Sequence, residues 1–337
     1  MWLDVDHSCS NLDVANSTKL KDVSVHIDEE IRKIVENNGS FSRNGRKCAY
    51  VTLASPGYDF GLKVLLPSIR RHSDIPIIVL ATRRWGFETA VPNVYLLVVP
   101  ALSNERYDPD RRELGCTLTK LWVFGLLCLE RVVFLDADCL VLKPIDDLFD
   151  TRGFCCAPDC IEGSETPRFN SGLMAFDPSS ELRDVLFDQA SRTDSYDHGD
   201  QGLLNNILRS RVTFLAPEYN VSRHYSLFHG PELAIEAARV IHYVVKKPWE
   251  LHYRETPDAA LLDLDELWTR QLSHKELLQL VSVWRRRQFL HERPRLESLQ
   301  WRALFWTNRR FRYVLAFIVL SLCLVPAILI AFILAKY

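Results

Sequence analysis

Residues 131–150 read RVVFLDADCLVLKPIDDLFD, and the expected fold is built around this stretch. The run Val132–Leu135 is β-branched and aromatic, which is typical of a strand buried on both faces of a sheet. Asp136 and Asp138 follow it, and alternate residues of an extended segment point the same way. Because two acids beside a buried strand are costly without a positive partner, we expect both to hold one divalent cation. The alternative is a strand-end turn with two solvated acids.

Strand-like and helix-like stretches alternate before this strand. Strands are expected at Cys48–Leu53, Pro76–Thr82 and Val94–Val99, and helices at Phe60–His72 and Thr119–Leu129. The alternation predicts an α/β fold, in which a Rossmann-like domain has a mostly parallel sheet covered by helices. Ligands of such sheets bind at the carboxyl ends of the strands, where Asp136 and Asp138 are expected. No glycine-rich dinucleotide or P-loop signature follows any strand, which counts against a dehydrogenase or a P-loop enzyme.

Three later stretches add complementary chemistry. They are Phe169–Phe176 (FNSGLMAF), DHGDQG at residues 197–202 before the helical run Leu203–Leu208, and the predicted strand Arg239–Trp249 (RVIHYVVKKPW). His242 offers a nitrogen ligand, which Mn²⁺ accepts more readily than Mg²⁺ does. Lys246 and Lys247 can neutralise phosphate oxygens, and the polar residues at 170, 197, 200 and 201 suit sugar hydroxyls. These groups predict a nucleotide-sugar site whose metal acts as a Lewis acid.

The C-terminal part of the chain is basic and contains a long apolar run. The formal net charge is −2, but residues 284–337 carry ten Lys and Arg against two Glu, which leaves −10 on residues 1–283. This asymmetry argues against nucleic acid and for a tail facing anionic lipid. Tyr313–Leu334 has no formal charge over 22 residues, enough to span a bilayer, with a buried soluble helix as the alternative. Arginines 309, 310 and 312 precede it and only Lys336 follows, which predicts a cytosolic catalytic domain.

We therefore expect a single-pass, tail-anchored protein of the endomembrane system (ER or Golgi). Its four parts are a polar extension at 1–46 with a short helix at Val25–Val35, a catalytic domain at 47–256, a helical basic juxtamembrane region at 257–312 and a transmembrane helix at 313–335. A single helix is expected over Pro257–Leu280. Nine scattered cysteines agree with a reducing compartment, and the glycosylation sequons at Asn16, Asn38 and Asn220 would matter only in a lumenal domain.

Five motifs, taken in order, resemble glycosyltransferase family 8, nearest to its glycogenin-like members. They are ELGCTLTKL at 113–121, FLDADCLVLKPIDDLF, FNSGLMAF, DHGDQGLLN and HYVVKKPW, and the resemblance covers roughly Cys48–Glu250. It implies a retaining transferase with a single Rossmann-like nucleotide-sugar domain that uses Mn²⁺, with Mg²⁺ as the alternative, and most often a UDP-sugar. The usual glycine between the histidine and Lys-Pro-Trp is missing here, so either Lys246 or Lys247 could contact the diphosphate.

The resemblance also implies roles for individual residues. Asp136, Asp138 and His242 are the expected metal ligands, and Lys247 is expected on the diphosphate. The other donor-binding residues are Leu53, Ser55 and Tyr58 around the uridine, Arg111 (or Arg112), Lys120 and Ala137, and Asn170, Asp197, Asp200 and Gln201 around the sugar, with Asp159 nearby. Asp200, Gln201 and Lys120 are the candidate catalytic residues. From the residues alone, Asp197 or Asp200 could instead be a helix N-cap, and His242 an ordinary strand-end histidine.

We expect a membrane-anchored, metal-dependent retaining enzyme that transfers a hexosyl group, with glucose first, from a UDP-sugar to a lipid, glycan or protein. A membrane-associated lipid or glycan fits the anchor best. The attacking hydroxyl is expected on the leaving-group face, with Asp200 as the alternative nucleophile. Two alternatives are a glycogenin-like protein that glucosylates itself, for which Tyr219-Asn220 and Tyr225 offer loose support, and a catalytically silent nucleotide-sugar-binding membrane protein. A nucleotidyltransferase normally has a glycine-rich loop that this chain lacks. A homodimer is compatible with all of these readings.

Overall fold

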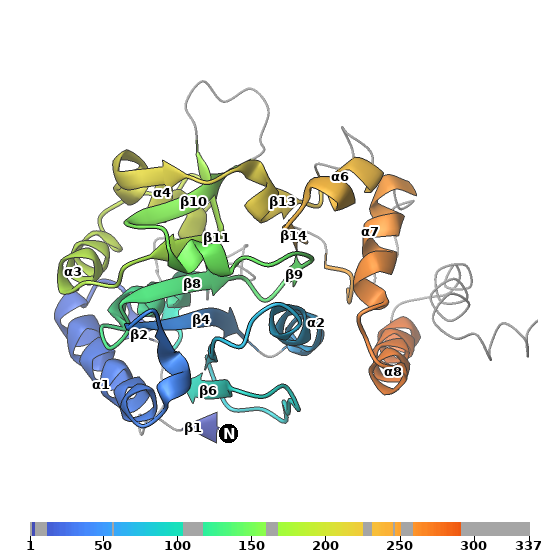
Figure 1. Ribbon diagram of the computed structural model, residues 1–337, viewed down its shortest axis with the longest axis horizontal. Coiled ribbons are helices and arrows are strands. Elements are labelled where there is room, and N and C mark those ends of the chain that lie inside the picture. The colour runs from blue at the N-terminus through green and yellow to red at the C-terminus, as the bar shows by residue number, and fades with distance from the viewer. Residues whose placement is uncertain are drawn as a thin grey trace, which may run out of the picture. The chain divides into compact units, whose positions relative to one another are not determined.

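A nine-stranded sheet organises the larger part of the molecule (Figure 1). Its strands are β1 (Trp2–Leu3), β3 (Ser42–Arg43), β4 (Arg46–Ala54), β5 (Ile77–Ala81), β6 (Val94–Val98), β8 (Arg131–Leu135), β10 (Phe154–Pro158), β11 (Phe169–Phe176) and β12 (Val212–Phe214). The order is β1-β6-β5-β4-β8-β11-β10-β12, with β3 paired to β4 alone. The pairs from β1 to β8 are parallel, whereas β11 is antiparallel to β8 and β10. The predicted α/β fold with a mostly parallel sheet is confirmed.

Helices and shorter sheets complete the fold. The α-helices are α1 (Ser17–Glu36), α2 (Asp59–Arg70), α3 (Ser180–Gln189), α4 (Asp200–Leu208), α6 (Pro231–Ala237), α7 (Ala259–Thr269) and α8 (His274–Leu290). The 3₁₀ helices are η1 (Gly39–Phe41), η3 (Thr117–Gly125), η4 (Asp146–Phe149), η5 (Arg209–Arg211) and η6 (Pro217–Asn220). β2 (Leu12–Asp13) pairs with β7 (Leu102–Ser103), and β9 (Cys139–Val141), β14 (Val240–His242) and β13 (Val221–Ser222) form a third sheet.

The computed structural model describes residues 2–3, 12–55, 57–103, 117–159, 168–224, 231–244, 247–250 and 259–290. The chain divides into two compact units, residues 1–247 with 258–264, and residues 248–257 with 265–337. Within the described ranges, no helix is both long enough and apolar enough to cross a membrane. The predicted transmembrane segment at 313–335 lies outside those ranges, as does the arginine-rich stretch that precedes it.

Three predicted elements differ from the observed ones. The helix expected at Thr119–Leu129 is the 3₁₀ helix η3, whose last residue lies against α1: a Cβ on Gly125 would meet Ser24 Oγ at 2.0 Å. The helix expected at Pro257–Leu280 is two helices, because Ser273 and Glu276 form a capping box in which Ser273 N donates to Glu276 Oε2 at 2.9 Å. Within the described residues of the predicted strand Arg239–Trp249, which exclude 245 and 246, the paired strand is Val240–His242.

α1 is longer than the predicted helix and contributes to the core. Asn16 caps it by accepting from Lys19 N at 3.1 Å, and the helix runs for 20 residues. One face is buried in the same hydrophobic cluster as the sheet, through Leu20, Val23, Ile27, Ile31 and Val35. Each such buried aliphatic side chain contributes about 1.5–3 kcal/mol. α1 contacts η3 and α3, so residues 17–36 stabilise the sheet rather than standing apart from it.

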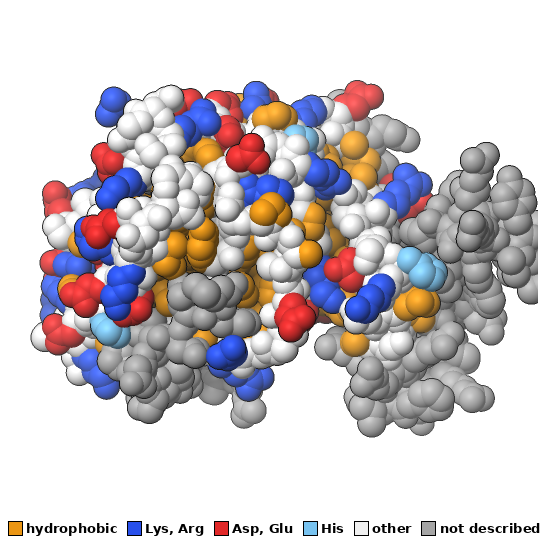
Figure 2. Space-filling model, turned by 60° about the horizontal axis from the view of Figure 1, so that its bottom comes forward, with side chains coloured by type: hydrophobic (Ala, Val, Ile, Leu, Met, Phe, Trp, Pro, Cys, Tyr) orange, Lys and Arg blue, Asp and Glu red, His pale blue; other side chains and the backbone are white. Residues whose placement is uncertain are grey.

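The surface of the described residues mixes both signs of charge. Figure 2 shows acidic and basic side chains interspersed over one face of the molecule, without a continuous stripe of either sign among the described residues. Some of these charges form local pairs, such as Lys21 with Asp188 at 3.0 Å. Exposed pairs of this kind contribute little to stability, about 0–1 kcal/mol each. Buried ionisable side chains are more informative, and four of them, Lys120, Asp138, Asp200 and His242, lie near the end of β8.

The chain folds so that distant segments meet at the carboxyl end of β8. β8 is parallel to β4 and antiparallel to β11, and Gly172 O in β11 accepts from Asp136 N at 2.8 Å. After β8 a turn leads into β9, which pairs antiparallel with β14 and places His242 directly opposite Cys139. This pairing is what brings His242 to the acids that follow β8.

Candidate functional site

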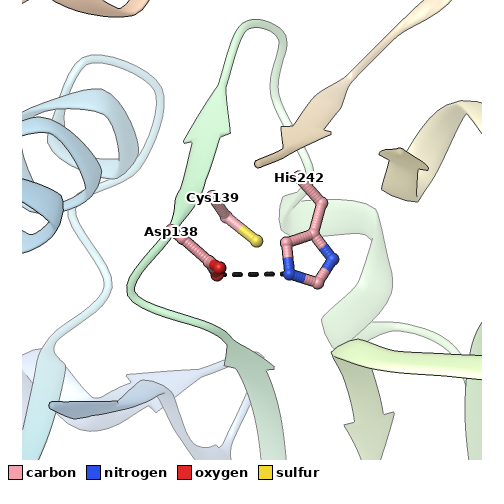
Figure 3. Close-up of side chains that lie close together, drawn as sticks. All are labelled: Asp138, Cys139 and His242. Atoms are coloured by element: carbon pink, nitrogen blue, oxygen red, sulfur yellow. Dashed lines mark ion pairs between the residues drawn. The ribbon is translucent and has the colours of Figure 1, made fainter. Parts of the chain in front are cut away.

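Asp136, Asp138 and His242 lie together at the end of β8. His242 Nε2 is 3.2 Å from Asp138 Oδ1 and 3.8 Å from Asp136 Oδ2. Figure 3 shows the Asp138 carboxylate and the His242 ring facing each other. The expected extended conformation of the Asp-x-Asp segment is wrong, because Cys139 N donates to Asp136 O at 3.0 Å and closes a turn. The two acids therefore approach His242 from a turn, not by alternation along a strand.

A hydrogen-bond network orients the ring of His242. Asn170 Oδ1 accepts from Gly172 N at 2.9 Å and from Asn220 Nδ2 at 2.8 Å, which identifies it as the amide oxygen. His242 Nδ1 lies 3.1 Å from that oxygen and donates to it. With its proton on Nδ1, a neutral imidazole would direct the lone pair of Nε2 at the carboxylates. Asp138 Oδ1 is buried and lies 3.2 Å from Nε2.

This arrangement fits a divalent cation. Asp138 Oδ1 and His242 Nε2 face each other 3.2 Å apart, so a carboxylate oxygen and a neutral imidazole nitrogen could bind one ion between them. Carboxylate oxygen and imidazole nitrogen are ligands that Mn²⁺ accepts, whereas Mg²⁺ favours oxygen. Asp136, Asp138 and His242 would hold the ion. The ring of His242 also occupies the space where a side chain on Gly172 would lie, with Cε1 2.0 Å from an added Cβ.

Lys120 is a buried cation that joins the acids of the site. Its Nζ lies 3.0 Å from Asp136 Oδ1 and 2.6 Å from Asp200 Oδ2, and it stands over the ring of Phe134. Burial lowers the pKa of Lys120, but the two carboxylates outweigh it and place the pKa above its ordinary value. Lys120 is therefore charged at physiological pH and neutralises Asp136 and Asp200.

Lys247 contacts the other acid of the pair. Its Nζ donates to Asp138 Oδ2 and to Tyr243 O, the latter at 3.1 Å. Burial raises the pKa of Asp138, but Lys247 and His242 outweigh it and hold the pKa well below its usual range. Lys247 thus reaches the centre, while Lys246 lies outside the described residues, as do Arg111 and Arg112. Lys247 has a long, flexible side chain, so its ammonium group could leave the Asp138 carboxylate and contact a phosphate group instead.

The predicted sugar-side residues Asp200 and Gln201 begin α4 and connect to β11. Asp200 Oδ2 accepts from Ser171 Oγ at 2.7 Å, and Gln201 Oε1 accepts from Ser171 N at 3.2 Å. Gln201 Nε2 donates to Asp159 Oδ2 at 3.0 Å. Burial raises the pKa of Asp159, against the hydrogen bonds that Asn170 and Gln201 donate to it. Asp159, Asp200 and Gln201 therefore form one network with Lys120 and the end of β8.

Asp197 and Asn170, both predicted on the sugar side, make hydrogen bonds within the protein. Asp197 Oδ1 accepts from the backbone N–H groups of Gly199 and Gly202, each at 2.9 Å, and so caps the start of α4. This is the N-cap alternative that the sequence leaves open. His198 supports the turn with a left-handed φ of 59°. Asn170 is 8% exposed and lies behind the His242 ring, where it orients the imidazole.

The residues expected around the uridine surround the end of β4. Leu53 is in β4, and Ser55 O accepts from Tyr58 N at 3.0 Å in the turn into α2. All three side chains are half-buried, and Tyr58 is close enough to affect the pKa of Lys247. Ala137 is buried in the turn after β8. Because β4 and β8 are parallel neighbours, this group borders the Asp136 end of the site.

Four residues of the site were not predicted from the sequence. Ser171 and Gly172 belong to the FNSGLMAF motif, whose small residues could have indicated close packing against another element. Asn220 supports Asn170 from η6 and is 2% exposed, although its sequon is typical of a surface loop. Cys139 follows Asp138 directly, and its thiol lies within 4.8 Å of a ligand atom of Asp138 and of His242. For Asn220 and Cys139 the sequence carries no local signal, because the contacts are long-range.

Comparison with known proteins identifies relatives that match half of this chain or more. Residues 160–252 match the family model "Glycosyl transferase family 8". Mouse glycogenin-1 is 33% identical over 250 residues, covering 69% of this chain and 73% of that protein. Human glycogenin-1 is 35% identical over 223 residues, covering 61% of this chain, and the chain spans 63% of that relative. Inositol phosphorylceramide glucuronosyltransferase 1 of Arabidopsis thaliana is 32% identical over 188 residues, covering 51% of this chain and 32% of that protein.

A solved structure supports the fold. The glycosyltransferase GlyE of Streptococcus pneumoniae TIGR4 superposes with a TM-score of 0.51 at 18% identity, covering 71% of this chain and 63% of that chain. At this identity the likeness speaks for the arrangement of strands and helices alone.

Proposed function

The chain belongs to glycosyltransferase family 8, and on that premise we propose that it transfers a hexosyl group, with glucose as the first candidate, from a UDP-sugar to an acceptor hydroxyl with retention of configuration. The observation that carries this proposal is the convergence of Asp136, Asp138 and His242 between the buried Lys120 and the half-buried Lys247. Carboxylates and a neutral histidine suit a divalent ion, and the lysines suit the phosphates that such an ion accompanies. A UDP-sugar supplies both diphosphate and sugar.

In this proposal Asp136, Asp138 and His242 hold Mn²⁺, with Mg²⁺ as the alternative. The bound ion supplies Lewis-acid stabilisation of the diphosphate as it departs. Lys247, which contacts Asp138 in the present structure, turns to the diphosphate when donor binds. Ser55 and Tyr58 face the nucleotide side at the end of β4. Asn170 keeps His242 Nδ1 protonated and so keeps Nε2 available as a ligand.

Asp200 and Gln201 meet the sugar, with Lys120 holding Asp200 in place. Asp200 Oδ2 is shared by Lys120 at 2.6 Å and Ser171 Oγ at 2.7 Å, which stabilises its negative charge and weakens it as a nucleophile. This favours attack of the acceptor hydroxyl on the leaving-group face, where a phosphate oxygen takes the proton. A covalent intermediate on Asp200 is the alternative. It would require Lys120 to release that oxygen during the reaction.

The acceptor we propose is a membrane-associated lipid or glycan. The uncharged run Tyr313–Leu334 motivates this, and the lipid acceptor in the name of the Arabidopsis relative is consistent with it. The same run and its flanking arginines underlie the proposed single-pass anchorage in the ER or Golgi with a cytosolic catalytic unit. The glycogenins among the relatives favour a second candidate, transfer to the protein itself. The proposed homodimer remains a prediction.

One experiment separates these candidates. Membranes containing the full chain are incubated with labelled UDP-glucose, UDP-galactose or UDP-glucuronic acid and Mn²⁺, and label is followed into lipid extract, glycan and the protein band. Wild type is compared with Asp138→Ala and with Asp188→Ala, a surface acid 43% exposed on its side chain. We expect label in lipid or glycan from wild type and Asp188→Ala, and only background from Asp138→Ala. Label on the protein band would support the self-glucosylating alternative.

A catalytically silent protein would give a different result. It would bind labelled UDP-sugar in wild type and lose binding in Asp138→Ala, but it would neither transfer nor hydrolyse the donor. Full transfer by Asp138→Ala would contradict the assignment of the site itself, because Asp138 lies nearer to His242 Nε2 than Asp136 does, at 3.2 Å against 3.8 Å.

A further inference from the structure

Cys139 stands at the centre of the site without a role in the transfer chemistry. It lies directly opposite His242 in the antiparallel pairing of β9 with β14, and directly opposed residues project from the same face of a sheet. Figure 3 shows its Sγ directed toward the gap between the Asp138 carboxylate and the His242 ring. The thiol is fully buried and its only hydrogen-bond acceptor in the described residues is Gly172 O, at 3.7 Å. Because this contact is weak, the sulfur could bind another partner.

The neighbouring charges leave three donor atoms facing one another. Lys120 holds both oxygens of Asp136, at 3.0 and 3.1 Å, and Lys247 contacts Asp138 Oδ2. What remains is Asp138 Oδ1 and His242 Nε2, which face each other at 3.2 Å, and Cys139 Sγ (Figure 3). Asp138, Cys139 and His242 each offer one ligand atom, and these atoms all lie within 4.8 Å of one another. These ligand atoms are one oxygen, one nitrogen and one sulfur.

The distances suit a small tetrahedral ion. Two ligand atoms bound about 2.0 Å from a tetrahedral Zn²⁺ are about 3.3 Å apart, and a sulfur at about 2.3 Å lies about 3.5 Å from a bound nitrogen. The separation of Asp138 Oδ1 and His242 Nε2 is already 3.2 Å. The sulfur would need to move by on the order of 1 Å, which a small rotation about its Cα–Cβ bond supplies.

We propose that Asp138 Oδ1, Cys139 Sγ and His242 Nε2 form a second metal site, selective for thiophilic ions of the zinc class. Sulfur ligands favour Zn²⁺ and Cd²⁺, whereas Mn²⁺ prefers oxygen and nitrogen. On binding, a metal–sulfur bond replaces the thiol S–H bond and the proton passes to solvent, while water completes the tetrahedron. Because the site shares Asp138 and His242 with the Mn²⁺ site of the proposed function, the two ions exclude each other. Zinc-class ions are thus inhibitors of the proposed reaction.

The test uses Co²⁺ as a spectroscopic probe for the zinc site. The purified full chain is titrated with Co²⁺ and followed by near-ultraviolet absorption, where cobalt bound to thiolate gives a sulfur-to-metal charge-transfer band. We expect a band that saturates in wild type, disappears on addition of Zn²⁺, and is absent from Cys139→Ser. Cys128→Ser is the matched control, because Cys128 is also buried but lies beside Asp28 in α1, away from the site. It should keep the band.

Two further measurements show whether a lost band reflects loss of the metal site rather than loss of a cysteine or of the fold. Asp138→Asn retains every cysteine, and it should weaken Co²⁺ binding at least about tenfold, since even outer-shell changes cost 10–100-fold. Cys139→Ser should bind Mn²⁺, measured by electron paramagnetic resonance, as tightly as wild type, which shows that the fold of the site is intact. No charge-transfer band in wild type, or an unchanged band in Cys139→Ser, would overturn the proposal. Neither result bears on sugar transfer, so the proposed function would stand.

Discussion

His242 stands between Asp138 and Asn170: its Nε2 lies 3.2 Å from Asp138 Oδ1, and its Nδ1 lies 3.1 Å from Asn170 Oδ1. Asn170 thereby holds the ring with Nε2 turned toward the carboxylate, where a cation would bind. This relationship depends on residues that never touch the ion, and it makes their substitution informative.

Gly172→Ala should damage metal binding without changing any ligand. An added Cβ would lie 2.0 Å from His242 Cε1 and 2.4 Å from Nδ1, so the ring must move off its position. We expect Mn²⁺ affinity, measured by electron paramagnetic resonance in the absence of donor, to fall about 10–100-fold. Gly86→Ala is the matched control, since nothing lies within 4 Å of an added Cβ there. Equal Mn²⁺ affinities for the two variants would show that the ring is not confined.

Asn170→Ala distinguishes a role in orienting His242 from a direct role in sugar binding. Loss of Oδ1 removes the acceptor of His242 Nδ1, and we expect Mn²⁺ affinity without donor to fall about 10–100-fold. A residue that contacts only the sugar would instead raise the KM for UDP-glucose and leave Mn²⁺ binding unchanged. Asn206→Ala, at an exposed position of α4, controls for loss of an asparagine side chain.

Lys120→Met should destabilise the fold. The substitution leaves the buried Asp200 and the half-buried Asp136 without their cation, and removing one partner of a buried ion pair costs about 3–5 kcal/mol. Urea denaturation followed by circular dichroism measures the loss. Lys33→Met removes an exposed lysine of α1, 67% exposed on its side chain, and should cost no more than about 1 kcal/mol. Similar free energies of unfolding for both variants would show that Lys120 does not stabilise the fold through Asp136 and Asp200.

Mn²⁺ itself should stabilise the protein through Asp138. An ion that binds the native state alone adds about 2.7 kcal/mol at a hundredfold excess over its Kd, which raises Tm by roughly 5–10 °C for a unit of this size. Thermal unfolding with and without Mn²⁺ measures the shift. Asp138→Asn keeps the size of the side chain but removes its charge, so its Tm should respond weakly. An equal rise in Tm for Asp138→Asn would place the ion elsewhere.

The sheet was readable from the sequence because its central strands are continuous apolar runs. Cys48–Leu53, Pro76–Thr82 and Val94–Val99 predict β4, β5 and β6 to within two residues at each end. The break between α7 and α8 was missed by the prediction of a single helix, although Ser273 and Glu276 have the spacing of a capping box. Strand-period and cap signals are local, and local signals survive in a single sequence.

The interior of the site was only partly readable. The acids, the histidine and the lysines could be named, because their chemistry is visible in the letters. Their geometry could not, since it depends on the pairing of Cys139 with His242 and on Asn220 reaching Asn170. Those contacts join segments far apart in the chain. Asp197 shows the limit, because an acid just before a helix suits either a sugar or the first N–H groups of the helix, and the sequence does not separate the two.

The burial of Asn220 bears on where the catalytic unit can mature. Its amide nitrogen donates to Asn170, and the residue is only 2% exposed to solvent. An oligosaccharide could therefore be attached there only before η6 and β13 fold into place. Sugar attachment and completion of the metal site would then be mutually exclusive fates of the same nascent chain. A membrane orientation that exposed residue 220 to the glycosylation machinery would divide the protein into an active, unmodified population and a modified one unable to assemble its histidine ligand.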